Sequence, residues 1–321
     1  MDKYYVGIDT SNYTTSLAVI DAGGNTLIDL RKILEVKKNQ VGLRQQDAIF
    51  QHMKNLPLMI DKLSNIIDPG NINTISVSVA PRTVKDSYMP VFQVGKGQAF
   101  ILSSILKKPL KQFSHQEGHI SSGMLNSPLE DEKRFLAFHL SGGTTELLLI
   151  DNEKDNFDIN IIGGTKDLNI GQLIDRIGVA MGIRFPCGRE LDYISQKGKR
   201  INLKLPMSTH GTWANFSGME NYFKKIYGEN IYYREDIANT LFYCISQFII
   251  RIVLEASYLY DVKYILFIGG VSSNSIIRDE LLKGLNYNDI ECYFPNTDIC
   301  TDNGVGMANL GRIKKGHVWE I

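Results

Sequence analysis

Two stretches of this chain decide its fold because they repeat one pattern. Residues 5–21 have the sequence YVGIDTSNYTTSLAVID, and residues 135–151 have the sequence FLAFHLSGGTTELLLID. Each is an apolar run, a short loop of small or polar residues, and a second apolar run that ends in Asp. This pattern is typical of a β-hairpin. Its recurrence about 130 residues later predicts that each half of the chain opens with the same unit.

Strands and helices alternate along the remainder of the chain. Hydrophobic spacing predicts helices over 47–65, 97–106, 116–125, 171–181, 237–259 and 303–312, and strands over 74–79 and 264–268. Alternation of this kind predicts an α/β fold.

The length of 321 residues exceeds what one hydrophobic core usually covers, so we expect two lobes. The polar stretch 126–133 is the best candidate for their junction. Residues 1–128 are then the N-terminal lobe and residues 129–302 the C-terminal lobe, with a closing helix over about 303–321 that packs back on the N-terminal lobe.

The composition excludes several classes of protein. Lys and Arg number 35 and Asp and Glu also number 35, so the chain is not a polybasic nucleic-acid coat. Hydrophobic residues make up 43% of the chain, which excludes intrinsic disorder. The most apolar stretch, 241–260, contains Gln247, Arg251 and Glu255 at intervals of four residues, which predicts a core helix with one polar stripe and no membrane span.

The cysteines predict a reducing compartment. Cys187, Cys244, Cys292 and Cys300 contain no CxxC pair and are too few for a disulfide framework in a chain of this length. The first residues run directly into a strand pattern, which leaves no room for a signal peptide. We therefore expect a cytoplasmic protein and interpret Cys187 and Cys244 as buried structural thiols.

Three loops are candidates for binding one nucleotide. Residues 141–145, SGGTT, follow a strand, and glycines there let backbone N–H groups approach an anion. Residues 269–274, GGVSSN, follow a buried strand and open a helix, and the turn 10–15 is a third loop of this kind. Each loop alone is more often a simple turn, and none matches the known phosphate-loop or dinucleotide fingerprints. Asp175 and Gly188 are further candidates for ribose and backbone contacts, although a helix-borne Asp is usually only solvated.

His115 and His119 lie one helical turn apart in the sequence HQEGH, which suits one transition-metal ion. Asp302 is the best candidate for a third ligand. For the isolated pair, two surface histidines one turn apart are an equally good interpretation. A zinc protease is excluded because Glu117 would point roughly 200° around the helix from the histidines.

Taken together, the motifs resemble one family. They are GIDTSNYTTSLAVI at the start of the chain, followed in order by SHQEGH, LSGGTTEL, GQLIDRIGVAMGIRFPCG, NFSGMENYF, GGVSSN and CTDNG. In this order they are similar to the universal tRNA threonylcarbamoyladenosine synthase family, the glycoprotease-like proteins. The resemblance implies a two-lobed actin-like ATPase (ASKHA) fold, in which duplicated βββαβα-type domains surround a nucleotide cleft.

The resemblance also implies an activity, which is the transfer of a threonylcarbamoyl group from its adenylate to N6 of the adenosine beside the anticodon of tRNA. It implies that His115, His119 and Asp302 hold one divalent metal ion, expected to be iron or zinc. Ser141 and Gly142 are the expected catalytic residues, at the phosphate and the acyl group. The expected contacts to threonylcarbamoyl-AMP or ATP are Thr10, Ser141, Gly142, Gly143, Asp175, Gly188, Gly269, Gly270 and Asn274.

Several positions depart from the family pattern. Asn12, Tyr13 and Thr14 replace the residues that usually follow the first Thr-Ser, which include acidic ones. Gln172 replaces a Glu, and Glu220 replaces a Lys. Two alternatives to tRNA modification therefore stay open: a carbamoyl-type transferase or ATPase with another acceptor, and a non-catalytic nucleotide-binding partner subunit. The expected partners are tRNA and the other subunits of a threonylcarbamoylation complex.

Overall fold

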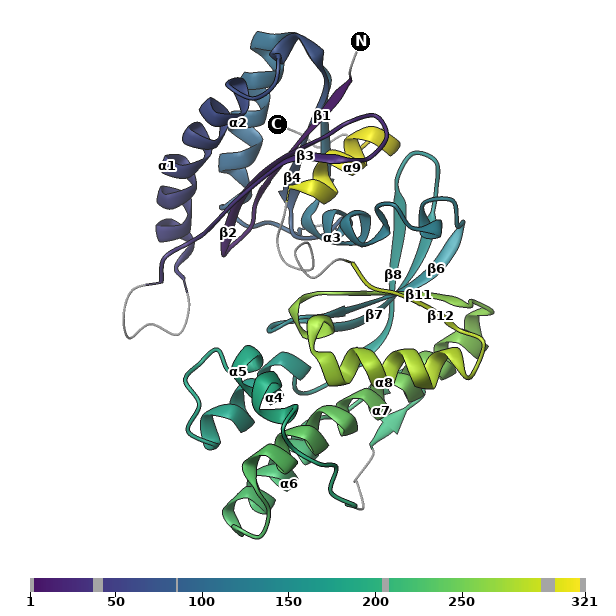
Figure 1. The fold of residues 1–321 in the computed structure, drawn as a ribbon. Helices are drawn as coiled ribbons and strands as arrows, with labels where there is room; N and C mark the ends of the chain where they lie inside the picture. The colour runs from purple at the N-terminus through teal and green to yellow at the C-terminus, as the bar shows by residue number, and fades with distance from the viewer. Residues whose placement is uncertain (1–2, 37–42, 85, 204–207, 296–303, 318–321) are drawn as a thin grey trace. The chain divides into compact units, whose positions relative to one another are not determined.

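A computed structural model of the chain describes residues 3–36, 43–84, 86–203, 208–295 and 304–317. The chain divides into two compact units (Figure 1). Unit 1 comprises Met1–Asp131, Asn152–Phe157 and Pro295–Ile321. Unit 2 comprises Glu132–Asp151 and Asp158–Phe294.

Unit 1 is built on one mixed sheet. In chain order its elements are β1 (Tyr4–Thr10), β2 (Thr14–Ile20), β3 (Thr26–Ile33), α1 (Gln45–Ser64), η1 (Pro69–Asn71), β4 (Ile72–Ala80), α2 (Phe92–Leu106), β5 (Leu110–Ser114), α3 (His115–Met124), η2 (Pro128–Glu130) and α9 (Val305–Ile313). The strand order is β3-β2-β1-β4-β5, with β1–β2 and β2–β3 antiparallel and β1–β4 and β4–β5 parallel.

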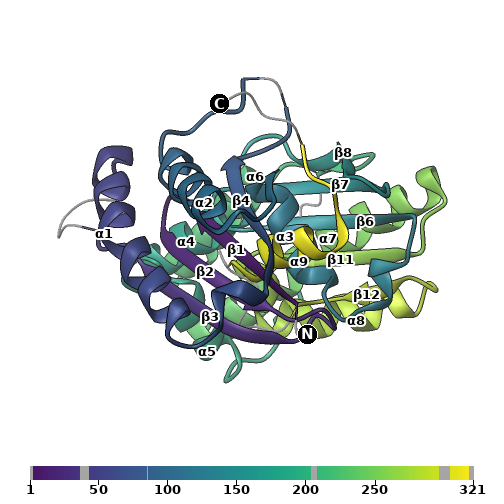
Figure 2. The same cartoon turned by 90° about the horizontal axis from the view of Figure 1, so that it is seen from above.

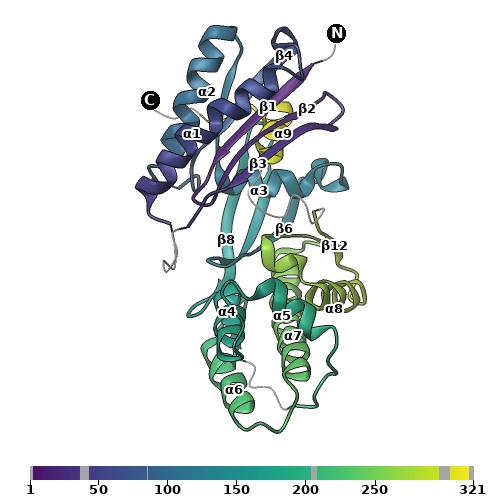
Figure 3. The ribbon, with the colours of Figure 1, turned by 60° about the vertical axis from the view of Figure 1, so that its left-hand side comes forward.

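Helices cover both faces of this sheet, which is why β1 and β2 are buried almost throughout. α1 and α2 lie on one face and α9 on the other (Figures 1 and 3). The contact of α9 with β1 is very close, because a Cβ on Gly7 would lie 2.1 Å from the carbonyl oxygen of Gly304. α9 also lies beside α3, where the Asn309 amide donates to the Ser121 carbonyl and hydroxyl (Figure 2).

Unit 2 carries a larger sheet. Its elements are β6 (Arg134–Leu140), β7 (Thr145–Asn152), β8 (Phe157–Thr165), α4 (Ile170–Ala180), α5 (Gly188–Ser195), β9 (Thr209–His210), β10 (Trp213–Ala214), α6 (Ser217–Gly228), α7 (Arg234–Tyr260), β11 (Tyr264–Ile268), η3 (Gly270–Ser273), α8 (Ser275–Asn286) and β12 (Glu291–Tyr293). The strand order is β12-β11-β6-β7-β8-β10-β9.

The two sheets share one topology. Strands β8, β7, β6, β11 and β12 repeat the order of β3, β2, β1, β4 and β5, and both central hairpins are antiparallel. In both units the first strand of the hairpin then pairs in parallel with the strand after the long helix. The duplication predicted from the two similar hairpins is therefore confirmed.

α7 is the core helix that its polar stripe predicts. Among the described residues it is the one helix long and apolar enough to cross a membrane, but 67% of its most apolar window is buried inside the protein. Phe242, Ile245 and Phe248 have no exposed surface, whereas Arg251 and Glu255 are exposed. Each fully buried side chain of this size contributes about 1.5–3 kcal/mol, so packing fixes this helix in unit 2.

The predicted helix over 97–106 was wrong at its start, because α2 begins at Phe92. Gly95 and Gly97 weaken the helical signal of the first turns. Gly95 is needed nonetheless, because a Cβ there would lie 2.7 Å from the Thr10 hydroxyl oxygen. Strands β3, β5 and β8 were not predicted either, because much of each is exposed or half-buried and the apolar alternation is weak.

Candidate functional site

The loops of unit 2 that we predicted to bind a nucleotide meet at one edge of its sheet. β6 and β11 are parallel neighbours, with His139 opposite Ile268, so the loops after both strands leave the same edge. Gly269 has φ +93°, and a Cβ there would lie 2.4 Å from the Leu140 carbonyl oxygen. This glycine therefore lets the two strand ends approach each other.

The loop after β6 presents free donors to solvent. The Ser141 N–H donates to the Thr144 carbonyl at 2.9 Å, which closes the turn. Gly142 and Gly143 are exposed, and no acceptor for their N–H groups occurs in the part of the chain that the structure describes. Exposed N–H groups in a tight loop are suited to bind phosphate or carbonyl oxygens.

The N-terminus of α4 packs closely against this loop. A Cβ on Gly171 would lie 2.5 Å from both the Gly142 Cα and the Ser141 carbonyl oxygen. The Asn169 amide donates to the Gly143 carbonyl at 2.9 Å, and the Ile170 N–H donates to the Thr145 hydroxyl at 2.9 Å. The positive end of the helix dipole therefore lies beside the free donors and favours an anion there.

Asp175 and Gly188 come together through a backbone hydrogen bond. The Cys187 N–H donates to Oδ1 of Asp175 at 2.8 Å, and Gly188 is the first residue of α5. Burial raises the pKa of Asp175, and the Cys187 N–H opposes that rise. Gly188 is exposed with open space where a Cβ would lie, so a ligand can approach its backbone.

Asn274 has a structural task that the sequence did not indicate. Its side-chain oxygen accepts from the Ile277 N–H at 2.9 Å and caps the N-terminus of α8. Ser275, the next residue, donates its hydroxyl to Asp192 of α5 at 2.9 Å. These contacts tie α8 to α5. Unit 2 thus brings Ser141, Gly142, Gly143, Asp175, Gly188, Gly269, Gly270 and Asn274 onto connected loops and helix ends.

Unit 1 holds the two histidines as a pair. His115 is the first residue of α3, which follows β5, and Nε2 of His115 lies 3.1 Å from Nε2 of His119. Nδ1 of His115 lies 3.0 Å from Oδ1 of Asp9, at the end of β1. Parallel pairing of β1, β4 and β5 puts these strand ends at one edge, so residues 106 apart in the sequence meet.

The pair suits a metal ion. Two imidazole nitrogens about 2.1 Å from a tetrahedral ion lie about 3.4 Å apart, and the observed Nε2–Nε2 distance of 3.1 Å is close to this value. A carboxylate at Nδ1 of His115 favours the tautomer whose Nε2 carries the lone pair. No group of three or more possible ligand side chains occurs among the residues that the structure describes, and Asp302 lies outside them.

Glu117 lies between the two histidines in sequence but faces away from them. Its side chain accepts from the N–H and the hydroxyl of Ser114, at 2.7 and 2.8 Å, and pairs with Nε2 of His317 at 2.8 Å. Ser114 and Glu117 form a capping box that starts α3. The geometric argument against a zinc-protease helix is therefore confirmed.

Thr10 and the turn after it are fixed by buried contacts. The Thr10 hydroxyl donates to the Val91 carbonyl at 3.1 Å and accepts from the Gly95 N–H at 3.2 Å, so it pins the start of α2. His52, fully buried in α1, contacts the Ser11 carbonyl and the Thr15 hydroxyl, both at 2.8 Å. Burial lowers the pKa of His52. Thr10 as a whole residue has no exposed surface, so its observed contacts hold the turn in place.

Sequence reasoning missed Asp9 and His52. Asp9 was available as a signal, because it is an acidic residue at the end of an apolar strand. Nothing in the sequence indicated His52, since its partners lie 37 and 41 residues away.

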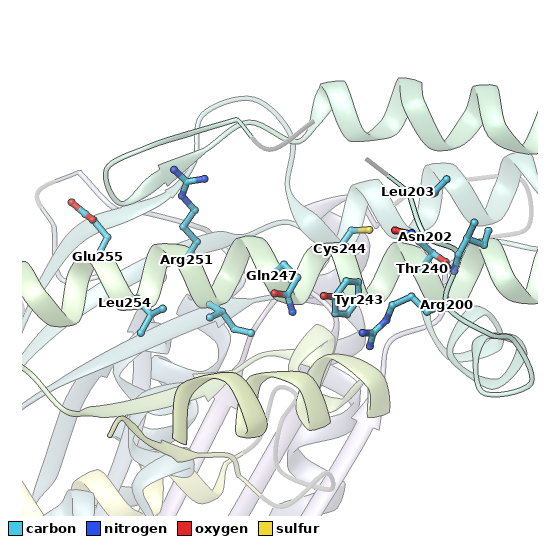
Figure 4. A pocket seen from close by; sticks show the side chains of 12 residues that line it. Arg200, Asn202, Leu203, Thr240, Tyr243, Cys244, Gln247, Arg251, Leu254 and Glu255 are labelled. Atoms are coloured by element: carbon cyan, nitrogen blue, oxygen red, sulfur yellow. Dashed lines mark hydrogen bonds between the residues drawn. The ribbon is translucent and has the colours of Figure 1, made fainter. Parts of the chain in front are cut away.

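A separate groove of about 850 Å³ runs along α7 and contains none of the predicted site residues (Figure 4). Its lining is Arg200, Ile201, Asn202, Leu203, Thr240, Tyr243, Cys244, Gln247, Ile250, Arg251, Leu254 and Glu255. The Arg200 guanidinium lies 3.4 Å from the centre of the Tyr243 ring. Burial raises the pKa of Cys244 to about 12, which disfavours the thiolate form. Cys187 is buried as well, which confirms the interpretation of both as buried thiols.

Solved structures define the class of protein. HypF of T. kodakarensis superposes with a TM-score of 0.65 at 14% identity, over 97% of this chain and 48% of that one. A ROK family glucokinase from Streptomyces griseus superposes with a TM-score of 0.55 at 10% identity, over 96% of this chain and 99% of that one. The duplicated sheet and these neighbours assign the chain to the actin-like ATPase (ASKHA) fold class, as predicted.

The sequence assigns the family. The model of the tRNA N6-adenosine threonylcarbamoyltransferase family matches residues 30–309. A tRNA N6-adenosine threonylcarbamoyltransferase of Sulfurihydrogenibium sp. (strain YO3AOP1) is 30% identical over 311 residues, which are 95% of this chain and 89% of that protein. The chain therefore belongs to the tRNA N6-adenosine threonylcarbamoyltransferase family, a family of transferases and not of proteases.

Proposed function

We propose that this chain transfers a threonylcarbamoyl group from threonylcarbamoyl-adenylate to N6 of adenosine in tRNA. The main support for this proposal is the imidazole pair of His115 and His119, whose Nε2 atoms lie 3.1 Å apart in a chain of this family. A nucleotide-binding regulator has no need of such a pair, whereas a metal-dependent transferase does.

Unit 2 supplies the proposed nucleotide contacts. The free N–H groups of Gly142 and Gly143, beside the N-terminus of α4, bind the phosphate and the acyl carbonyl. Charge that develops on the carbonyl oxygen is stabilised by the same donors. Asp175 accepts from the ribose, and the open backbone at Gly188 lets the sugar approach. Thr10, Ser141, Gly269, Gly270 and Asn274 complete the proposed set.

His115 and His119 are the proposed protein ligands of one divalent ion, with Asp302 as a third. Iron or zinc suits imidazole and carboxylate ligands. When bound, the ion supplies Lewis-acid chemistry that polarises a carbamoyl carbonyl or neutralises a leaving phosphate. His115 and His119 bring their Nε2 atoms within 3.1 Å of each other, and burial of His119, which is 7% exposed, keeps water from competing at that ring.

A second candidate is a transferase of the same fold with another acceptor. Glu220 favours it, because this carboxylate replaces a basic residue of the family pattern and pairs with Arg176 at 2.9 Å and Lys224 at 2.5 Å. Those contacts neutralise two cations beside α4 that would otherwise attract an RNA backbone.

The transfer reaction separates the candidates. The purified chain is incubated with threonylcarbamoyl-adenylate and unmodified tRNA, and AMP release and modified adenosine are quantified. We expect both products from the native chain and neither from His119→Ala. AMP release without modified adenosine would favour the second candidate, and binding of the adenylate without turnover would favour a non-catalytic partner subunit.

We also propose a cytoplasmic location, with tRNA and the other subunits of a threonylcarbamoylation complex as partners. The relatives that support this are tRNA-modifying enzymes by name. The lobe boundaries at 1–128, 129–302 and 303–321 stay a prediction from the sequence.

A further inference from the structure

Two buried carboxylates of unit 1 use their oxygens differently. Glu117, which has no exposed surface, satisfies both oxygens through Ser114 and His317. Asp9, which is 1% exposed, uses Oδ1 for His115, but its buried Oδ2 has no hydrogen-bond partner in the part of the chain that the structure describes. A buried carboxylate oxygen without a partner costs free energy, so packing and stability alone do not explain Asp9.

The one hydrogen bond of Asp9 determines what His115 can do. A carboxylate accepts only, so Nδ1 of His115 carries the proton and its Nε2 carries the lone pair. That Nε2 faces Nε2 of His119 at 3.1 Å, and the two rings meet edge to face with centroids 4.5 Å apart. The Phe92 ring contacts the His115 ring as well, with centroids 5.9 Å apart.

Asp9 is itself held rigidly. It lies in β1, opposite Ser16 of β2, and the turn that follows it is fixed by His52 through the Ser11 carbonyl. A carboxylate on such a strand cannot move with the imidazole, so it sets the angle of the ring. A metal ion at Nε2 adds positive charge to the imidazole and thereby compensates the buried charge of Asp9.

We infer that Asp9 is the positioning residue of the metal site: it fixes the tautomer and the ring angle of His115 so that Nε2 is presented to the ion. This inference rests on the metal pair of the proposed function. Asp9 is not a ligand, because Nδ1 of His115 stands between it and Nε2.

Cobalt(II) chloride titrated into the full-length chain tests the inference, because visible absorption reports both the affinity and the geometry of the bound ion. We expect Asp9→Asn to weaken Co²⁺ binding about 10- to 100-fold and to change the absorption bands. His119→Ala abolishes the bands. Asp29→Asn, which removes the same charge from an Asp–Arg31 pair on β3, leaves them unchanged.

Binding by Asp9→Asn within twofold of the native chain, with the same bands, would overturn the inference alone. A native chain that binds no Co²⁺ would overturn the metal pair together with it. A measurement on the native chain covers the case in which Asp9→Asn fails to fold. Nitrogen-15 spectra of its histidines are expected to show His115 protonated at Nδ1, and protonation at Nε2 contradicts the assignment.

Discussion

The turn between β1 and β2 and the turn between β6 and β7 occupy the same place in the two repeats, yet they differ in how they are held. Thr10, Ser11 and Thr14 at the base of the first are buried, whereas Tyr13 at its tip is 48% exposed. His52 and the start of α2 fix this turn from outside the hairpin. Gly142 and Gly143 of the second are exposed, and a Cβ on either would meet nothing within 4 Å.

The difference shows that duplicated hairpins can be specialised by their neighbours. Contacts from α1 and α2 bind the Thr10 hydroxyl, the Ser11 carbonyl and the Thr15 hydroxyl, so the first turn serves as a rigid support beside the histidine pair. The second turn contacts the start of α4 through the Gly142 Cα, the Gly143 carbonyl and the Thr145 hydroxyl, and the N–H groups of Gly142 and Gly143 point to no acceptor among the described residues.

Gly171→Val disrupts the close contact between the start of α4 and the turn that joins β6 and β7. The new side chain meets backbone atoms of Ser141 and Gly142 that have no alternative position, so we expect a loss of about 3 kcal/mol in the free energy of unfolding. ATP affinity measured by calorimetry falls at least tenfold. The control is Gly218→Ala, at a helical glycine with open space around it. Equal ATP affinity of the native chain and Gly171→Val would show that the contact of Gly171 with this turn is unimportant for nucleotide binding.

His52→Gln weakens the contacts that hold the turn between β1 and β2. It removes the hydrogen bond to the Ser11 carbonyl or the one to the Thr15 hydroxyl, so we expect a loss of about 1–3 kcal/mol, measured by urea unfolding at pH 7.5.

The same variant tests a pH dependence. The pKa of His52 is below its ordinary value of 6.5 in the folded chain, so the unfolded chain binds the proton more readily. Native stability is therefore full above pH 6.5 and falls as the pH drops below that value. In His52→Gln this part of the pH dependence disappears, and identical pH profiles for the two chains would refute the assignment.

Gly142→Ala is the smallest change, and it tests whether the turn between β6 and β7 tolerates a side chain. Because there is space for the methyl group and no positive φ at this position, we expect a change in unfolding free energy within about 0.5 kcal/mol. ATP affinity falls a few-fold, because the methyl group hinders approach to the N–H. A loss of stability above 2 kcal/mol would mean that this turn is as constrained as the first.

Several parts of the molecule were predictable from the sequence because their signals are local. The two hairpins, α7 with its polar stripe and the pairing of His115 with His119 each follow from spacing within one element. The start of α2 was not predictable, since Thr10 stabilises it from 81 residues away. The capping role of Asn274 was missed because its motif also fits a ligand contact.

The sequence by itself determined the duplication, the family and the candidate residues for phosphate and metal binding, because these depend on residue type and short spacing. The tertiary structure decided which of the two turns is held by neighbouring helices and which has exposed glycines at its centre. It also decided that Asp9, and not Glu117, contacts His115. Both outcomes depend on strand ends and helix faces that come from distant segments, and hydrophobic packing brings those segments together only when the sheet is complete.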